Sequence, residues 1–110
     1  MRAEPFQIVA EETTEAVILD VSGDFDLAVV PQMRSALEPV MHRTDKALIL
    51  QLGGLTYIDS TGIGVIVSVL KLRDELKAPF YVRDIPPAIM RLFELTGISG
   101  YLSSGNGDQP

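Results

Sequence analysis

The segment formed by residues 46–64 constrains the fold more than any other part of the chain. It begins with an almost continuous apolar run over residues 46–52, which is typical of a buried central strand. Asp59-Ser60-Thr61-Gly62 follows, and an apolar helical pattern then predicts a helix from residue 61 to about residue 77. Two hydroxyls are therefore expected where a strand passes into a helix. The amides and dipole of a helix N-terminus favour an anion by about 0.3 to 1 kcal/mol, so the fold would tolerate a phosphoserine there.

The remaining apolar patterns alternate between strand-like and helix-like segments. Residues 6–10 and 16–21 predict an antiparallel pair of strands, and residues 80–83 predict a further short strand. A first helix is expected from Pro31 to near Thr44, and a third from Pro87 to a C-cap at Gly97. Tyr101 and Leu102 suggest an additional edge strand. The pattern predicts an α/β fold with a mixed, mostly parallel sheet of four to five strands covered by helices.

Length and composition predict one domain with a protein partner. The chain has 110 residues, of which 46% are hydrophobic, and this suits a single core. We expect the domain to span residues 6–102 and residues 103–110, which contain no apolar side chain, to form a disordered tail. The net charge of -6 disfavours binding to nucleic acid or to an anionic membrane surface.

The absence of cysteine excludes disulfides, thiolate metal sites and thiol catalysis, and it fits a reducing compartment. No apolar run approaches the roughly 18 residues that a membrane span requires, and the N-terminus lacks the apolar core of a signal peptide. We therefore expect a cytoplasmic protein without direct membrane insertion.

Functional residues are expected in two loops, residues 22–26 and 57–62, because sites in such sheets gather where strands end and helices begin. Both loops contain carboxylates. Asp24 and Asp26 suit either turn formation or contact with a partner. Asp59 and Ser60 are also preferred helix caps, and their position alone favours capping over a functional role. Gly62 and Gly64 would allow a partner to approach the backbone closely.

The sequence offers no catalytic or cofactor site. The single histidine, His42, is expected in a different helix from Ser60, and no Gly-x-Ser-x-Gly motif surrounds that serine. Neither a complete phosphate-binding loop nor a complete dinucleotide-binding motif is present. We therefore expect no enzymatic activity, no cofactor and no metal.

Three segments carry a resemblance to the STAS family, specifically to its stand-alone bacterial anti-sigma factor antagonists. They are Gly23-Asp24-Phe25-Asp26 after a strand, Asp59-Ser60-Thr61-Gly62-Ile63-Gly64-Val65 at a helix start, and Pro87-Ala88-Ile89-Met90-Arg91-Leu92-Phe93-Glu94-Leu95-Thr96-Gly97. Their order and spacing match the family over roughly residues 6–102. The sequence departs from the usual pattern at residues 27–31, which are more apolar than is common there and indicate an altered binding surface.

The resemblance implies a partner-switching cycle. In this family the domain binds an anti-sigma factor that is also a serine kinase, and it thereby releases the sigma factor. The kinase then inactivates the domain by phosphorylating the serine that corresponds to Ser60, and a serine phosphatase of the metal-dependent class restores it. The implied partner-binding residues are Asp24, Asp26, Asp59, Ser60, Thr61 and Gly62. The alternative is an unphosphorylated STAS scaffold, or an accessory subunit of a signalling assembly or of a lipid or anion transporter.

Overall fold

The computed structural model describes residues 5–97, and the expected edge strand and C-terminal tail lie outside these residues. The order of the elements confirms the predicted alternation of strands and helices. In chain order, they are β1 (Gln7–Glu12), β2 (Ala16–Phe25), the 3-10 turn η1 (Leu27–Val29), α1 (Val30–Leu37), β3 (Ala47–Ile58), α2 (Ser60–Glu75), β4 (Phe80–Arg83) and α3 (Pro87–Thr96).

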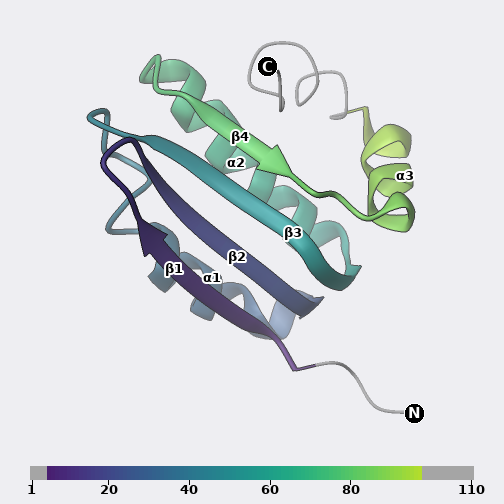
Figure 1. Ribbon diagram of the computed structural model, residues 1–110. Helices are drawn as coiled ribbons and strands as arrows, with labels where there is room; N and C mark the ends of the chain where they lie inside the picture. The colour runs from purple at the N-terminus through teal and green to yellow at the C-terminus, as the bar shows by residue number, and fades with distance from the viewer. Residues whose placement is uncertain (1–4, 98–110) are drawn as a thin grey trace.

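The four strands form one mixed sheet in the order β1-β2-β3-β4 (Figure 1). β1 pairs antiparallel with β2, while β2, β3 and β4 are parallel, as the sequence predicted. α1 and α2 lie behind the sheet in Figure 1. The main core lies between them and the sheet, where burial of apolar side chains supplies the largest favourable contribution to folding. Its fully buried members include Leu19, Leu50, Ile66, Phe80 and Phe93.

β2 and β3 are longer than the sequence patterns predicted. Their pairing continues past Val21 and Leu52 to the pair Phe25 and Ile58, with two register shifts on the way. Gly23 lies at one of these irregularities with a φ of 85°, a conformation that glycine adopts without steric cost. The glycines and aspartates that suggested strand ends therefore belong to irregular strands, and the extra length places Asp24 and Tyr57 at the end of the sheet where α2 begins.

The first helix is shorter than predicted. α1 ends at Leu37, whereas its apolar spacing suggested a helix reaching Thr44. Pro39 lacks the N–H that would continue the helical hydrogen bonds, so residues 38–42 form turns instead. Val40 and Met41 still pack against the core from these turns. Their burial produced the apolar pattern, although the backbone is not helical there.

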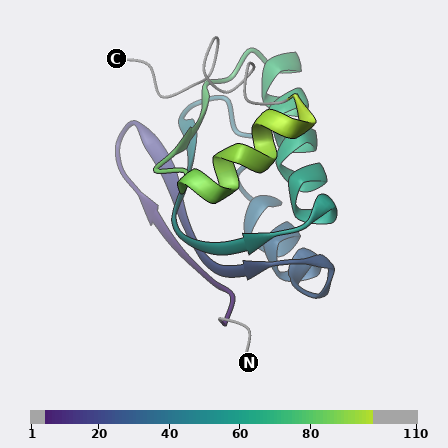
Figure 2. The same cartoon turned by 90° about the vertical axis from the view of Figure 1, so that its right-hand side faces the viewer.

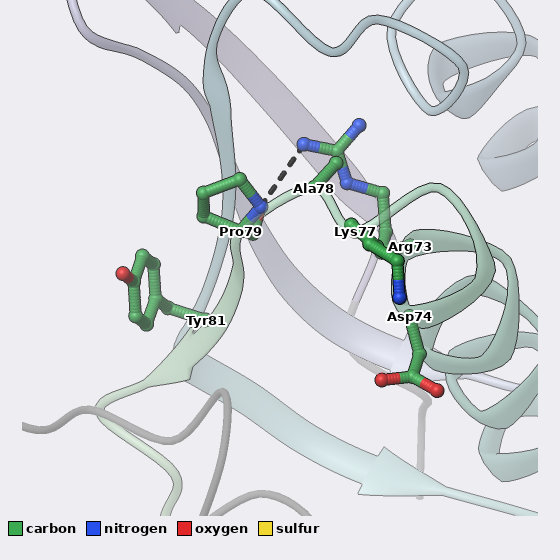
Figure 3. Close-up of a pocket in the computed structure, with 6 residues that line it drawn as sticks. All are labelled: Arg73, Asp74, Lys77, Ala78, Pro79 and Tyr81. Carbon is green, nitrogen blue, oxygen red and sulfur yellow. Dashed lines mark hydrogen bonds between the residues drawn. The ribbon is translucent and has the colours of Figure 1, made fainter.

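Arg73 of α2 is a fully buried cation that the sequence patterns did not indicate. Its guanidinium donates hydrogen bonds to the backbone carbonyls of Met41, Arg43, Lys46 and Pro79. Figure 3 shows the side chain reaching from the end of α2 toward Pro79. Burial lowers the pKa of Arg73 from its ordinary value. One side chain thus ties together the segments that precede β3 and β4, at the opposite end of α2 from Ser60.

Candidate partner-binding site at the start of α2

The carboxyl ends of β2 and β3 lie side by side, and α2 begins directly after β3 (Figure 2). Phe25 and Ile58 are the last paired residues, and the amide of Asp59 donates to the Phe25 carbonyl at 3.2 Å. Ser60 is the first residue of α2. The two segments that the sequence analysis selected therefore meet at one end of the sheet, although most of their residues are strand residues and not loop residues.

Asp59 caps α2. One carboxylate oxygen accepts hydrogen bonds from the Gly62 amide at 3.0 Å and from the Thr61 hydroxyl at 2.5 Å. The other oxygen accepts the Leu27 amide at 3.3 Å, which joins η1 to the start of α2. The Thr61 hydroxyl, followed by the Gly62 amide, holds the pKa of Asp59 below its ordinary value. The carboxylate is thus ionised at neutral pH and is engaged within the chain.

The two neighbouring hydroxyls have different surroundings. The Thr61 hydroxyl is bound to Asp59. The Ser60 side chain is exposed and makes no hydrogen bond to any residue in the part of the chain that the structure describes. Ser60 therefore presents an unengaged hydroxyl to solvent, whereas Thr61 supports the cap.

Asp24 and Asp26 also have partners within the chain. Asp24 lies in β2, and its carboxylate accepts the Thr56 hydroxyl at 2.6 Å across the sheet. Asp26 caps η1 by accepting the Ala28 amide at 3.0 Å. Both side chains are half-buried. The structure thus supports the turn-forming role for Asp26 and gives Asp24 a role in the sheet, while both carboxylates lie on segments next to Ser60.

Gly62 has a different role from the one that the sequence suggested. It is buried, and a side chain here would place its Cβ 2.9 Å from the Phe25 carbonyl oxygen and 2.8 Å from Cγ1 of Ile58. Glycine therefore lets the first turn of α2 pack closely on the ends of β2 and β3. Gly64 is exposed and open, and there an incoming partner would indeed meet only backbone.

Substitution of the two glycines by alanine should change the stability of the fold in opposite directions. Gly62→Ala is expected to destabilise the fold by about 1 to 3 kcal/mol, because the added methyl overlaps a carbonyl that cannot easily move. Gly64→Ala, in the open and in the same helix, should stabilise it by about 0.5 to 1 kcal/mol. Urea unfolding followed by circular dichroism measures both. Equal effects of the two substitutions would contradict the packing of Gly62 against β2.

The cap should give stability a pH dependence. Because the pKa of Asp59 is lower in the folded chain than in the unfolded chain, its contribution is complete above about pH 4 and is lost as the pH falls through the lowered value. Asp59→Ala should therefore cost about 1 kcal/mol at pH 7 and less in acid. Asp59→Asn, which retains a cap acceptor, is the control and should cost less. A cost of Asp59→Ala that does not depend on pH would refute this role.

Exposed apolar side chains flank the site. Leu27 in η1 is 66% exposed and Tyr57 in β3 is 49% exposed, and Tyr57 pairs with Asp24 in the register of the sheet. The sequence indicated the apolar character of residues 27–31 but gave no signal for Tyr57, because strand alternation is irregular there. The surface around Ser60 thus combines acidic and apolar groups.

Metal sites and membrane spans each have structural requirements, with which residues 5–97 can be compared. No group of three or more histidine, aspartate or glutamate side chains is arranged there to hold a metal ion. No helix in these residues has the length and hydrophobicity needed to cross a bilayer. His42 is exposed in the turns that follow α1.

The fold and the site together define an α/β domain that exposes a serine at the N-terminus of a helix, beside the ends of two parallel strands. The chain belongs to the STAS domain family, whose model matches residues 7–105. It is 29% identical over 101 residues to the anti-sigma-B factor antagonist of Staphylococcus aureus, covering 90% of this chain and 94% of that protein.

Solved structures share the fold. An anti-sigma factor antagonist from Mycobacterium paratuberculosis superposes with a TM-score of 0.75 at 22% identity, covering 88% of this chain and 82% of that one. The Bacillus cell fate determinant SpoIIAA in its phosphorylated form gives a TM-score of 0.68 at 19% identity, covering 88% of this chain and 87% of SpoIIAA.

Proposed function

We propose that this protein is an anti-sigma factor antagonist. It binds an anti-sigma factor that is also a serine kinase, releases the sigma factor, and is switched off when the kinase phosphorylates Ser60. The observation that carries the proposal is the exposed Ser60 hydroxyl, which makes no hydrogen bond to the described residues and lies next to Asp59, the helix cap. The names of the relatives, which are anti-sigma factor antagonists, give independent support.

Phosphorylation of Ser60 would weaken binding of the partner without unfolding the domain. A phosphate adds about -1.5 to -2 charges, and the N-terminus of α2 favours an anion, so the domain itself should remain folded. The added charge lies next to Asp59 and near Asp24 and Asp26, in a chain whose net charge is already -6. Docking would then place a concentrated negative charge at an interface, where repulsion and desolvation oppose binding.

The proposed partner surface has two kinds of residue. Ser60, Thr61, Asp24 and Asp26 border the surface that the anti-sigma factor covers. Asp59 and Gly62 hold it in shape, Asp59 by its cap and Gly62 by its close packing on β2. The unphosphorylated surface favours a partner with basic groups, because acidic patches are complementary to positive ones.

The chain acts in this cycle as ligand and substrate and has no catalysis of its own. A serine nucleophile needs a general base, and His42, the single histidine, lies in the turns after α1 and not in the Ser60 site. A serine phosphatase of the metal-dependent class restores the active form. This chain needs no cofactor and no nucleic acid for its part in the cycle. Because the cycle uses a sigma factor and ATP, we expect the protein to act in the cytoplasm.

A release experiment tests the proposal. Each anti-sigma factor kinase of the same genome is loaded with its sigma factor, and the purified chain is added with ADP. One of these complexes should release its sigma factor. Retention of the sigma factor by every complex would refute the function. Co-purification of the chain with a transporter subunit or a large signalling assembly would then favour the scaffold alternative.

A further inference from the structure

Leu27 is an exposed apolar residue on a hydrogen-bonded turn. It is 66% exposed, yet its amide donates to Asp59 at 3.3 Å. The next two amides are also fixed, because those of Ala28 and Val29 donate to the side chain and the carbonyl of Asp26 at 3.0 and 3.1 Å. A group that is already held in place loses little conformational entropy on binding. The backbone that presents Leu27 is therefore preorganised for a partner to bury the side chain.

The surroundings of Leu27 indicate what covers it. Its amide is bound to the same Asp59 carboxylate that caps α2, so Leu27 lies beside the start of α2 and the proposed partner surface. Asp26 and Asp59 flank it with negative charge. A complementary partner surface therefore has an apolar pocket for the leucine and lysine or arginine side chains around that pocket.

We propose that Leu27 is the apolar anchor that the anti-sigma factor buries when it binds this chain. This inference rests on the proposed function. It adds a residue that faces the partner directly, whereas the acidic side chains around it are already engaged within the chain. A buried apolar anchor inside a charged rim is the usual arrangement of an interface hot spot. Tyr57 extends the apolar surface at the same end of the sheet.

Exposure alone does not select Leu27, and Leu95 provides the comparison. Leu95 is 79% exposed and lies near the C-terminal end of α3. In Figures 1 and 2 this end of α3 lies away from the start of α2. It is the same residue type and is more accessible, but it has no link to the capping aspartate among the interactions of residues 5–97. Leu95 is thus a matched control for Leu27.

The test measures dissociation constants with the anti-sigma factor that the release experiment identifies. Leu27→Asn should weaken its binding to the unphosphorylated chain by about tenfold or more. Leu27→Met, which preserves apolar volume, should stay within about threefold of the unmodified chain. Leu95→Asn should bind as the unmodified chain does. Thermal unfolding verifies that each variant is folded.

Three outcomes would overturn the anchor. If Leu27→Asn binds as tightly as the unmodified chain while Ser60→Asp binds weakly, Leu27 is not the anchor and the proposed function stands. If Leu95→Asn weakens binding as much as Leu27→Asn, the effect is not specific to this surface and the anchor is refuted. Failure of the unmodified chain to bind any anti-sigma factor would overturn both the anchor and the proposed function.

Discussion

Ser60→Asp is expected to weaken binding of the anti-sigma factor by roughly thirtyfold to several thousandfold. The estimate corresponds to about 2 to 5 kcal/mol, the usual cost of a charge left without a partner at an interface. The substitution places a permanent carboxylate at the first residue of α2, next to Asp59. Isothermal titration of the purified variant with the anti-sigma factor measures the loss directly.

A neutral substitution separates charge from size. Ser60→Asn has nearly the shape of Ser60→Asp without its charge, so its loss of affinity should be much smaller. Ser60→Ala should bind about as well as the unmodified chain, because the Ser60 hydroxyl has no hydrogen bond to lose among the described residues. If the aspartate and asparagine variants bind equally, charge is not what controls the association.

Arg73→Met should lower the free energy of unfolding by about 3 to 5 kcal/mol, the largest stability effect expected in this chain. Methionine fills much of the space but donates no hydrogen bond, so four backbone carbonyls lose the guanidinium as a donor, and only that of Pro79 is known to keep another, the Leu48 amide. A buried polar group without a partner costs about 1 to 3 kcal/mol, and some of the four should recover water. Urea unfolding at neutral pH gives the value.

Two further variants test this role of Arg73. Arg73→Lys retains the charge, but one ammonium cannot serve four carbonyls, so an intermediate loss is expected. Arg91→Met removes an exposed arginine from α3 and should change stability by no more than about 0.5 kcal/mol. An effect of Arg73→Met as small as that of Arg91→Met would show that the guanidinium does not hold these segments. Because Arg73 lies ~20 Å along α2 from Ser60, folded Arg73 variants should still bind the anti-sigma factor.

The sequence predicted the order of the elements because apolar periodicity reports which backbone faces are buried. It was less reliable at element ends. Gly23 and Asp24 look like residues that end a strand, yet the parallel partner β3 continues to pair with them. Val40 and Met41 look helical because they are spaced for one buried face, although Pro39 supplies no amide and the chain continues there in turns.

The position of Ser60 at the start of a helix was predictable, but the roles of its neighbours depend on contacts across the fold. Gly62 is required by the Phe25 carbonyl, which belongs to a strand 37 positions earlier in the sequence. Arg73 sits in a helix whose other charged residues face solvent, and its carbonyl partners come from two separate loops. No local pattern marks such residues, because their partners are assembled only by the tertiary structure.

The most direct test of the proposed switch is to determine which residue the kinase phosphorylates. The purified chain is incubated with the anti-sigma factor kinase and ATP, and the product is digested and mapped by mass spectrometry. We expect one phosphate, on Ser60, with Thr61 unmodified and with no incorporation in Ser60→Ala. Phosphate on another residue, or a chain that binds the kinase and stays unmodified at Ser60, would contradict the proposed switch.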